Sequence, residues 1–189
     1  MRVIAGAYRG RIIYSVSDRS VRPATDRVRQ TIFDLLTSRT VLEGTAVLDL
    51  FAGSGSLGIE ALSRGARHIT FVEKNDRAAA SIQRNLDALG CTSQAEILQM
   101  DARSFIFSAH PAFDLVFADP PYAYEGTKEL VHETFRHRLL NPGGYLIIEH
   151  TKDLHFESTQ VYNVGPVKKF GTTLVTFFQS ASSGQSTTF

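Results

Sequence analysis

The chain contains little cysteine and no long apolar run. Its one cysteine, Cys91, cannot form an internal disulfide. No stretch approaches the ~20 apolar residues of a membrane-spanning helix, and the N-terminal residues lack the longer apolar segment of a signal peptide. We therefore expect a protein of the reducing cytoplasm that does not enter a membrane.

Metal-ligand spacing is also missing. The six histidines have no cysteine partners and do not follow the spacing of a zinc site. We predict no metal centre.

The length is suited to one α/β domain with a small appendage, because 189 residues are too few for two full domains. Hydrophobic residues make up 43% of the chain and charged residues 21%, as in ordinary globular proteins. No apolar surplus is obvious, so we expect a monomer.

Positive charge is concentrated at the N-terminal end. The net charge is only +1, yet residues 1–40 contain eight arginines, no lysine and three aspartates. A guanidinium group can bind phosphate through two hydrogen bonds and stack on bases, so this segment favours a nucleic-acid partner. A solvated basic face is the alternative, since a charge block by itself is weak evidence.

From residue 46 onward, short β-rich runs alternate with amphipathic segments of helix length, which is typical of a parallel sheet covered by helices on both faces. The predicted strands span residues 46–51, 68–73, 95–100, 113–119 and 144–150. The predicted helices span residues 56–64, 76–89 and 126–139, the second with Asn75 as N-cap and Gly90 just beyond its end. The pattern indicates a doubly wound α/β domain over residues 41–179.

The C-terminal part of that domain changes its pattern. Two β runs, 160–164 and 169–178, have no helix between them and are joined through Gly165 and Pro166. We predict that they close the sheet as an antiparallel pair. The Ser/Thr-rich residues 180–189 are predicted to be a disordered tail.

The N-terminal residues 1–40 are predicted to form a separate arginine-rich extension. Residues 3–5 and 11–14 suggest a hairpin around Gly6 and Gly10. A helix capped by Thr25 or Asp26 follows. Its predicted buried stripe consists of Val28, Ile32, Leu35 and Leu36, flanked by Arg27 and Arg29.

The first predicted strand runs into a turn that contains Gly53 and Gly55 and then into a helix. Glycine suits a sharp turn where a ligand lies directly against the backbone. Glu73 follows Gly53 by 20 residues at the end of the second strand, where an acid can accept hydrogen bonds from both hydroxyls of a ribose. The pattern predicts a nucleoside-containing cofactor, either NAD(P) or S-adenosylmethionine.

Two acids favour S-adenosylmethionine. Asp49 lies near the end of the first strand, where a carboxylate suits a cationic sulfonium or aminoacyl group and would repel a pyrophosphate. Asp101 and Ala102 end the third strand, where the acid can accept from an adenine amino group and the next N–H can reach a ring nitrogen. Asp101 could instead cap the following turn.

The fourth predicted strand ends in Asp119, Pro120, Pro121 and Tyr122, beside the first strand of a doubly wound sheet. An ionised Asp119 offers one hydrogen-bond acceptor, and the Pro120 carbonyl offers a second because the prolines restrict the backbone. Two such acceptors can hold a planar amino group for methylation. Tyr122 can stack on a flat base, a contact that contributes about 1–3 kcal/mol.

These motifs resemble the RsmD family of bacterial ribosomal RNA methyltransferases. The resemblance covers the chain from Arg2 to about Phe178. It includes the segments 9–11, 22–29, 51–66 and 170–173 as well as the Asp-Pro-Pro-Tyr motif. Two positions depart from the family pattern: some members carry phenylalanine in place of Tyr122, which keeps the stacking surface, and threonine is common in place of Ala24. The family implies a class I, Rossmann-like methyltransferase fold with a seven-stranded, mostly parallel sheet, and methylation of a guanine amino group in 16S ribosomal RNA.

The resemblance also implies roles for individual residues. Asp119, Pro120, Pro121 and Tyr122 would hold and stack the target base. The cofactor residues would be Asp49, Phe51, Gly53, Gly55, Glu73, Asp101 and Ala102. The RNA contacts would be Arg9, Arg11, Arg22, Arg27 and Arg29, with ribosomal RNA in a small-subunit assembly particle as the partner. Four alternatives stay open: methylation of an adenine amino group in DNA or RNA, methylation of a glutamine amino group, an NAD(P)-dependent oxidoreductase, and a non-enzymatic RNA-binding module.

Overall fold

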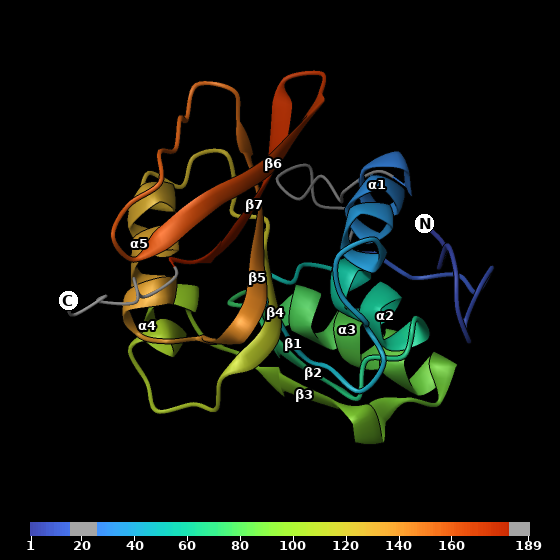
Figure 1. The fold of residues 1–189 in the computed structure, drawn as a ribbon. Coiled ribbons are helices and arrows are strands. Elements are labelled where there is room, and N and C mark those ends of the chain that lie inside the picture. The colour runs from blue at the N-terminus through green and yellow to red at the C-terminus, as the bar shows by residue number, and fades with distance from the viewer. Residues whose placement is uncertain (16–25, 182–189) are drawn as a thin grey trace.

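A computed structural model describes residues 1–15 and 26–181 of the chain. They form a seven-stranded sheet with helices on both faces (Figure 1). The strands are β1 (Ala46–Leu50), β2 (His68–Val72), β3 (Ala95–Leu98), β4 (Phe113–Ala118), β5 (Leu140–Thr151), β6 (Tyr162–Phe170) and β7 (Thr173–Ser180). The helices are α1 (Asp26–Thr37), α2 (Ser56–Ser63), α3 (Asp76–Leu89), α4 (Ala102–Ile106) and α5 (Thr127–Arg136), with a short 3-10 turn at Thr92–Gln94.

The strand order is β3-β2-β1-β4-β5-β7-β6, with β1 to β5 parallel and β7 antiparallel to both of its neighbours. The predicted doubly wound, mostly parallel sheet is therefore confirmed. The chain leaves β1 toward β2 on one side and later returns to β4 on the other. In such a sheet the loops after these two strands border a crevice at their carboxyl ends.

The central strands are almost continuously apolar because helices cover both of their faces. One core cluster joins Val47, Phe71 and Phe117 to α1, α2 and α3. The other joins Leu48, Val116 and Ile148 to α4 and α5. Figure 1 shows the two groups of helices on opposite sides of the sheet.

The two ends of α3 are determined by local sequence signals. Asn75 caps it by accepting hydrogen bonds from the backbone N–H groups of Arg77 and Ala78, and Gly90 ends it in the left-handed conformation at φ 71°. Both predicted ends are confirmed. The short helix α4 was not predicted, because five residues carry too little periodicity to show an amphipathic pattern.

The predicted turn of the C-terminal hairpin is wrong. The strands β6 and β7 do pair antiparallel, but the chain turns at Gly171 and Thr172, where Gly171 has φ 61°. Gly165 and Pro166 lie inside β6 at a shift in the pairing register. Proline is accepted there because β6 is the edge strand, where a missing N–H breaks no central ladder.

The N-terminal residues form the predicted antiparallel turn, with a single bridge between Arg2 and Ile12. Val3 and Ile13 are buried in the same core cluster as the sheet. In α1 the buried stripe contains Phe33 and Arg29 in addition to three of the predicted residues, whereas Leu35 is only half-buried. The predicted cap Thr25 lies outside the described residues, as do residues 182–189 of the predicted tail.

Within the described ranges, no helix has the length and apolar character that a bilayer crossing requires. The same residues contain no group of three or more histidine, cysteine or acidic side chains placed to hold a metal ion.

Candidate active site

The glycine loop follows β1 and leads into α2. Phe51, Gly53 and Gly55 all have positive φ angles, 58°, 56° and 75°. A Cβ on Gly55 would lie 3.2 Å from Phe71 and Ile82, so packing against the protein itself already favours glycine there. Gly53 is half-buried and remains the position at which the backbone can meet a ligand.

Glu73 connects this loop to the end of β2. One carboxylate oxygen accepts a hydrogen bond from Gly53 N at 2.8 Å, and the other accepts from Asn75 N at 2.7 Å. Each oxygen has a second lone pair, so the side chain can still accept from the hydroxyls of a ribose. Glu73 therefore shapes the loop and keeps acceptor capacity for the predicted ribose.

Asp49 lies beneath the loop and is 2% exposed. Its carboxylate accepts a hydrogen bond from Gly58 N at 2.9 Å. Burial raises the pKa of Asp49 to about 8; the Gly58 hydrogen bond opposes this shift, and the charge of Glu73 adds to it. A buried carboxyl with one neutral donor and an acidic neighbour is suited to a cation, which fits the sulfonium and amino groups of S-adenosylmethionine.

Asp119 follows directly after β4. Its pKa is raised well above the ordinary range, first by burial and then by the charges of Glu149 and Asp49. The isolated protein thus opposes the ionised state that the sequence reasoning assumed. A cation that binds between these acids would favour ionisation again.

Glu149 is an acidic neighbour that the sequence reasoning missed. It lies on β5, one residue beyond Ile148, which pairs with Ala118 just before Asp119. An acid after the apolar run 145–148 was the available signal. Only the pairing of β4 with β5 reveals which residue it faces.

The chain turns directly after the two prolines. The Pro121 carbonyl accepts a hydrogen bond from Tyr124 N at 2.7 Å, which closes a turn. Among the described residues, no donor is bonded to the Pro120 carbonyl. That carbonyl therefore remains available to an amino group. Tyr122 is 58% exposed, as a ring that receives a base must be.

Asp101 does cap the following helix, the alternative noted from the sequence. One of its carboxylate oxygens accepts from the N–H groups of Arg103 and Ser104, and the other lies 3.6 Å from the Lys74 ammonium. Ala102 is the first residue of α4, where the backbone N–H has no partner within the helix. The cap and the predicted adenine contacts are therefore compatible.

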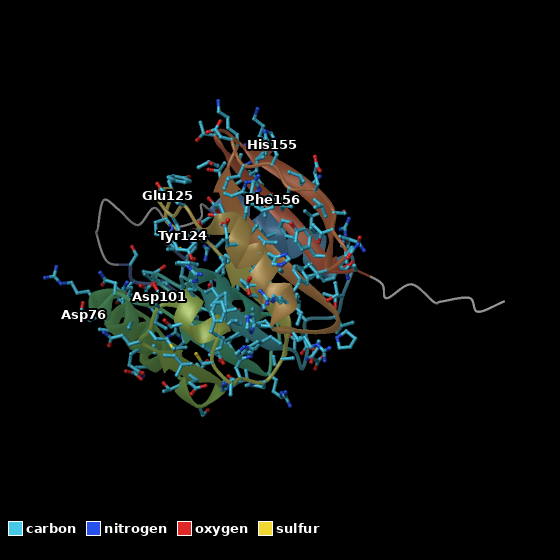
Figure 2. All side chains as sticks on the ribbon, turned by 90° about the vertical axis from the view of Figure 1, so that its left-hand side faces the viewer. Asp76, Asp101, Tyr124, Glu125, His155 and Phe156 are labelled. Atoms are coloured by element: carbon cyan, nitrogen blue, oxygen red, sulfur yellow. The ribbon has the colours of Figure 1, made fainter. Side chains whose placement is uncertain are left out.

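Tyr124 is a second aromatic residue that the sequence reasoning passed over. Its ring meets Phe51 edge-on at a centroid distance of 5.2 Å, and burial together with the charge of Asp101 raises its pKa. Figure 2 shows Tyr124 and Asp101 on the same side of the molecule. Phe51, Tyr124 and Asp101 thus border the end of the site where the adenine is expected.

The predicted RNA-binding arginines divide into two groups. Arg9, Arg11 and Arg27 are exposed, although one Arg11 nitrogen also donates to Ala88 O at 2.7 Å. Arg29 is fully buried, and its guanidinium donates to Arg2 O at 2.6 Å and to Asp26 at 2.8 Å. The prediction that Arg29 contacts RNA is wrong, because this side chain joins α1 to the N-terminal turn. Arg22 lies outside the described residues.

Comparison with known proteins shows the family of this chain. A family model described as Conserved hypothetical protein 95 matches residues 1–179. Ribosomal RNA small subunit methyltransferase D of Haemophilus influenzae is 36% identical over 156 residues, which cover 81% of this chain and 80% of that protein.

Solved structures extend the likeness to the fold. The structure of the Escherichia coli protein YhhF, named as a methyltransferase, has a TM-score of 0.83 and 29% identity, and the match covers 95% of this chain and 97% of that chain. A Streptococcus mutans structure named as a SAM-dependent methyltransferase has a TM-score of 0.66 and 16% identity, and the match covers 80% of this chain and 48% of that chain. The chain therefore belongs to the Conserved hypothetical protein 95 family, which is the RsmD family that its motifs resemble, and has the class I methyltransferase fold.

Proposed function

We propose that this protein transfers a methyl group from S-adenosylmethionine to the exocyclic amino group of a guanine in small-subunit ribosomal RNA. Family membership and relatives named as ribosomal RNA small subunit methyltransferases support the methyl donor and the class of acceptor. The choice of guanine rests on the family name and on the chemistry of the Asp-Pro-Pro-Tyr motif.

The observation that carries the proposal is the placement of Asp119 and Pro120 at the end of β4, beside the glycine loop that follows β1. Asp119 accepts one amino hydrogen and the Pro120 carbonyl accepts the other, which aims the nitrogen lone pair at the methyl group. When bound, S-adenosylmethionine supplies an electrophilic methyl group on a positively charged sulfur. When the amino nitrogen takes up the methyl group and S-adenosylhomocysteine is left as the neutral product, Asp119 or water would accept the amino proton that is lost.

The acidic cluster supplies the matching electrostatics. Burial makes ionisation of Asp49 and Asp119 costly, as their raised pKa values show, and the charges of Glu149 and Asp49 add to that cost for Asp119. A sulfonium placed among them lowers that cost, so an ionised Asp119 accompanies a loaded site. The acceptor geometry is then complete only when the methyl donor is present.

The substrate contacts outside the crevice involve the exposed arginines Arg9, Arg11 and Arg27, together with Arg22 from the sequence motif. Guanidinium groups suit phosphate oxygens. Because extrusion of a base from a helix costs a few kcal/mol, we place the target guanine in a loop or hairpin tip. We further propose that a monomer acts in the cytoplasm on a partly assembled small subunit, the place where such RNA is exposed.

The decisive experiment is methyl transfer from tritiated S-adenosylmethionine to RNA and small-subunit particles from a strain that lacks the enzyme. We expect the label in N2-methylguanosine and no label with Asp119→Ala, which should still bind S-adenosylhomocysteine. Label in adenosine would overturn the choice of base. A thermal shift with NADH and none with S-adenosylhomocysteine would overturn the cofactor.

A further inference from the structure

Tyr122 is largely exposed, but its hydroxyl group forms a hydrogen bond within the protein. The Tyr122 hydroxyl and the Thr173 Oγ1 lie 2.8 Å apart, and either group can donate. Thr173 is 51 residues further along the chain, at the start of β7, and is 7% exposed. A hydrogen bond therefore joins the aromatic residue of the active-site motif to the C-terminal hairpin.

The backbone at Tyr122 is already restricted, so the remaining freedom lies in the side chain. Two prolines precede Tyr122, and the hydrogen bond from Tyr124 N to Pro121 O closes the turn around it. With 58% of the residue exposed, neighbouring side chains provide little packing to select one rotamer. The Thr173 contact is the interaction that selects a ring orientation.

Thr173 is suited to act as a fixed point. It pairs with Phe170 across the β6–β7 turn and with Thr151 on β5. The backbone of the preceding residue is held as well, since Lys152 N donates to Thr172 O at 3.2 Å. As a β-branched residue, threonine also has few χ1 alternatives. Three strands thus determine where its hydroxyl lies, and Figure 1 shows β5, β6 and β7 side by side.

We propose that Thr173 is a positioning residue that orients the Tyr122 ring for stacking on the target base. This inference rests on the proposed function, because it takes Tyr122 as the residue that meets the guanine. Thr173 itself acts only through Tyr122.

The test compares Thr173→Val, which keeps the shape and removes the hydroxyl, with Thr173→Ser, which keeps the hydroxyl. We expect Thr173→Val to lower kcat for RNA methylation about fivefold, the size of one neutral hydrogen bond, while KM for S-adenosylmethionine and the melting temperature stay unchanged. Thr173→Ser should restore kcat to within about twofold of the wild type. Thr172→Val, at the exposed neighbouring position, is the matched control and should leave all values unchanged.

The double variant Tyr122→Phe/Thr173→Val separates positioning from a general structural effect. If Thr173 acts through the tyrosine hydroxyl, Tyr122→Phe alone should cause the same loss and the double variant no more. The inference is overturned if Thr173→Val keeps full kcat, if serine does not restore it, or if valine causes the same additional loss in the Tyr122→Phe background. Absence of methyl transfer by the wild type would instead overturn the proposed function.

Discussion

At the scale of single residues, burial of charge governs this site. Asp49 has one backbone donor and an acidic neighbour, and its pKa of about 8 lies far above the usual carboxyl value. A positively charged ligand beside such a carboxyl favours its ionised form, so this carboxyl favours binding of a cation. Its titration should therefore be visible both in stability and in cofactor binding.

The first prediction concerns Asp49→Asn, which keeps an acceptor oxygen for Gly58 N. In the wild type the folded state binds the Asp49 proton more tightly than the unfolded state, so this group's contribution to stability is complete below the unfolded pKa of about 4 and is lost as pH rises toward 8. We expect the unfolding free energy to fall less steeply between pH 5 and 8 in Asp49→Asn, as measured by urea denaturation.

Cofactor binding should show the opposite trend with pH. Because the ionised carboxylate attracts the sulfonium, the affinity of the wild type for S-adenosylmethionine should rise between pH 6 and 8, with release of a proton on binding. Asp49→Asn should bind more weakly and with a flatter pH dependence. Calorimetry in buffers of different ionisation enthalpy measures both, and an unchanged pH profile would contradict this role of Asp49.

At the scale of elements, α2 is the part that connects the cofactor loop, the sheet and the N-terminal turn. The Glu60 carboxylate is fully buried and accepts hydrogen bonds from Ile4 N at 2.8 Å, Ala5 N at 3.0 Å and Arg64 Nε at 2.7 Å. One side chain of the helix thus holds the arginine-rich turn in place. Three donors for one buried charge also explain why an acid is tolerated on a helix whose every residue is buried.

The second prediction follows from this contact. Glu60→Ala leaves two backbone donors and a guanidinium nitrogen without their partner, so it should cost about 3 kcal/mol of unfolding free energy. Hydrogen exchange at the amides of Ile4 and Ala5 should become faster than in the wild type. Glu43→Ala, at an exposed position, is the control and should change neither quantity.

The third prediction compares two glycines that are needed for different reasons. A Cβ on Gly58 would overlap the Phe71 ring of β2, whereas a Cβ on Gly90 would meet open space but in the left-handed conformation. Gly58→Ala should therefore cost about 3 kcal/mol through overpacking, and Gly90→Ala about 1 kcal/mol through backbone strain. Equal losses of unfolding free energy in the two variants, measured by urea denaturation, would show that packing against Phe71 is not the reason for glycine at position 58.

At the scale of the whole molecule, the acidic residues of the candidate site and the exposed N-terminal arginines lie on different elements. The acidic groups Asp49, Asp119 and Glu149 lie at the carboxyl ends of β1, β4 and β5, whereas the exposed Arg9, Arg11 and Arg27 lie on the N-terminal turn and α1. Under the proposed function, the cationic methyl donor and the anionic RNA approach different parts of one surface. Binding of RNA should consequently depend on salt far more strongly than binding of the cofactor does.

The fourth prediction uses the neighbouring arginines of α1 as a matched pair. Arg27→Gln removes an exposed charge and should weaken RNA binding while leaving stability unchanged. Arg29→Gln removes a buried guanidinium that donates to Arg2 O and Asp26, and it should cost about 2 kcal/mol of unfolding free energy, the scale of lost charge-assisted hydrogen bonds. If about four phosphates are contacted, the slope of log affinity against log salt should be near −3 in the wild type and about one unit shallower in Arg27→Gln.

The sequence by itself determined the order of the central elements and the type of site. Periodic apolar runs, the cap at Asn75 and the glycines after β1 are local signals, and the Asp-Pro-Pro-Tyr motif carries its chemistry within four adjacent residues. Such features depend on neighbours in the chain, so they can be predicted without the fold.

The tertiary structure alone decided which distant groups meet. It buried Arg29 and left Arg27 exposed, brought Glu149 of β5 beside Asp119, moved the hairpin turn to Gly171, and joined Tyr122 to Thr173. Burial and strand register depend on the packing of the whole sheet, and pKa shifts depend on both. For this reason candidate site residues within the local motifs could be predicted from the sequence, while Glu149, Tyr124 and the burial of Arg29 followed only from the fold.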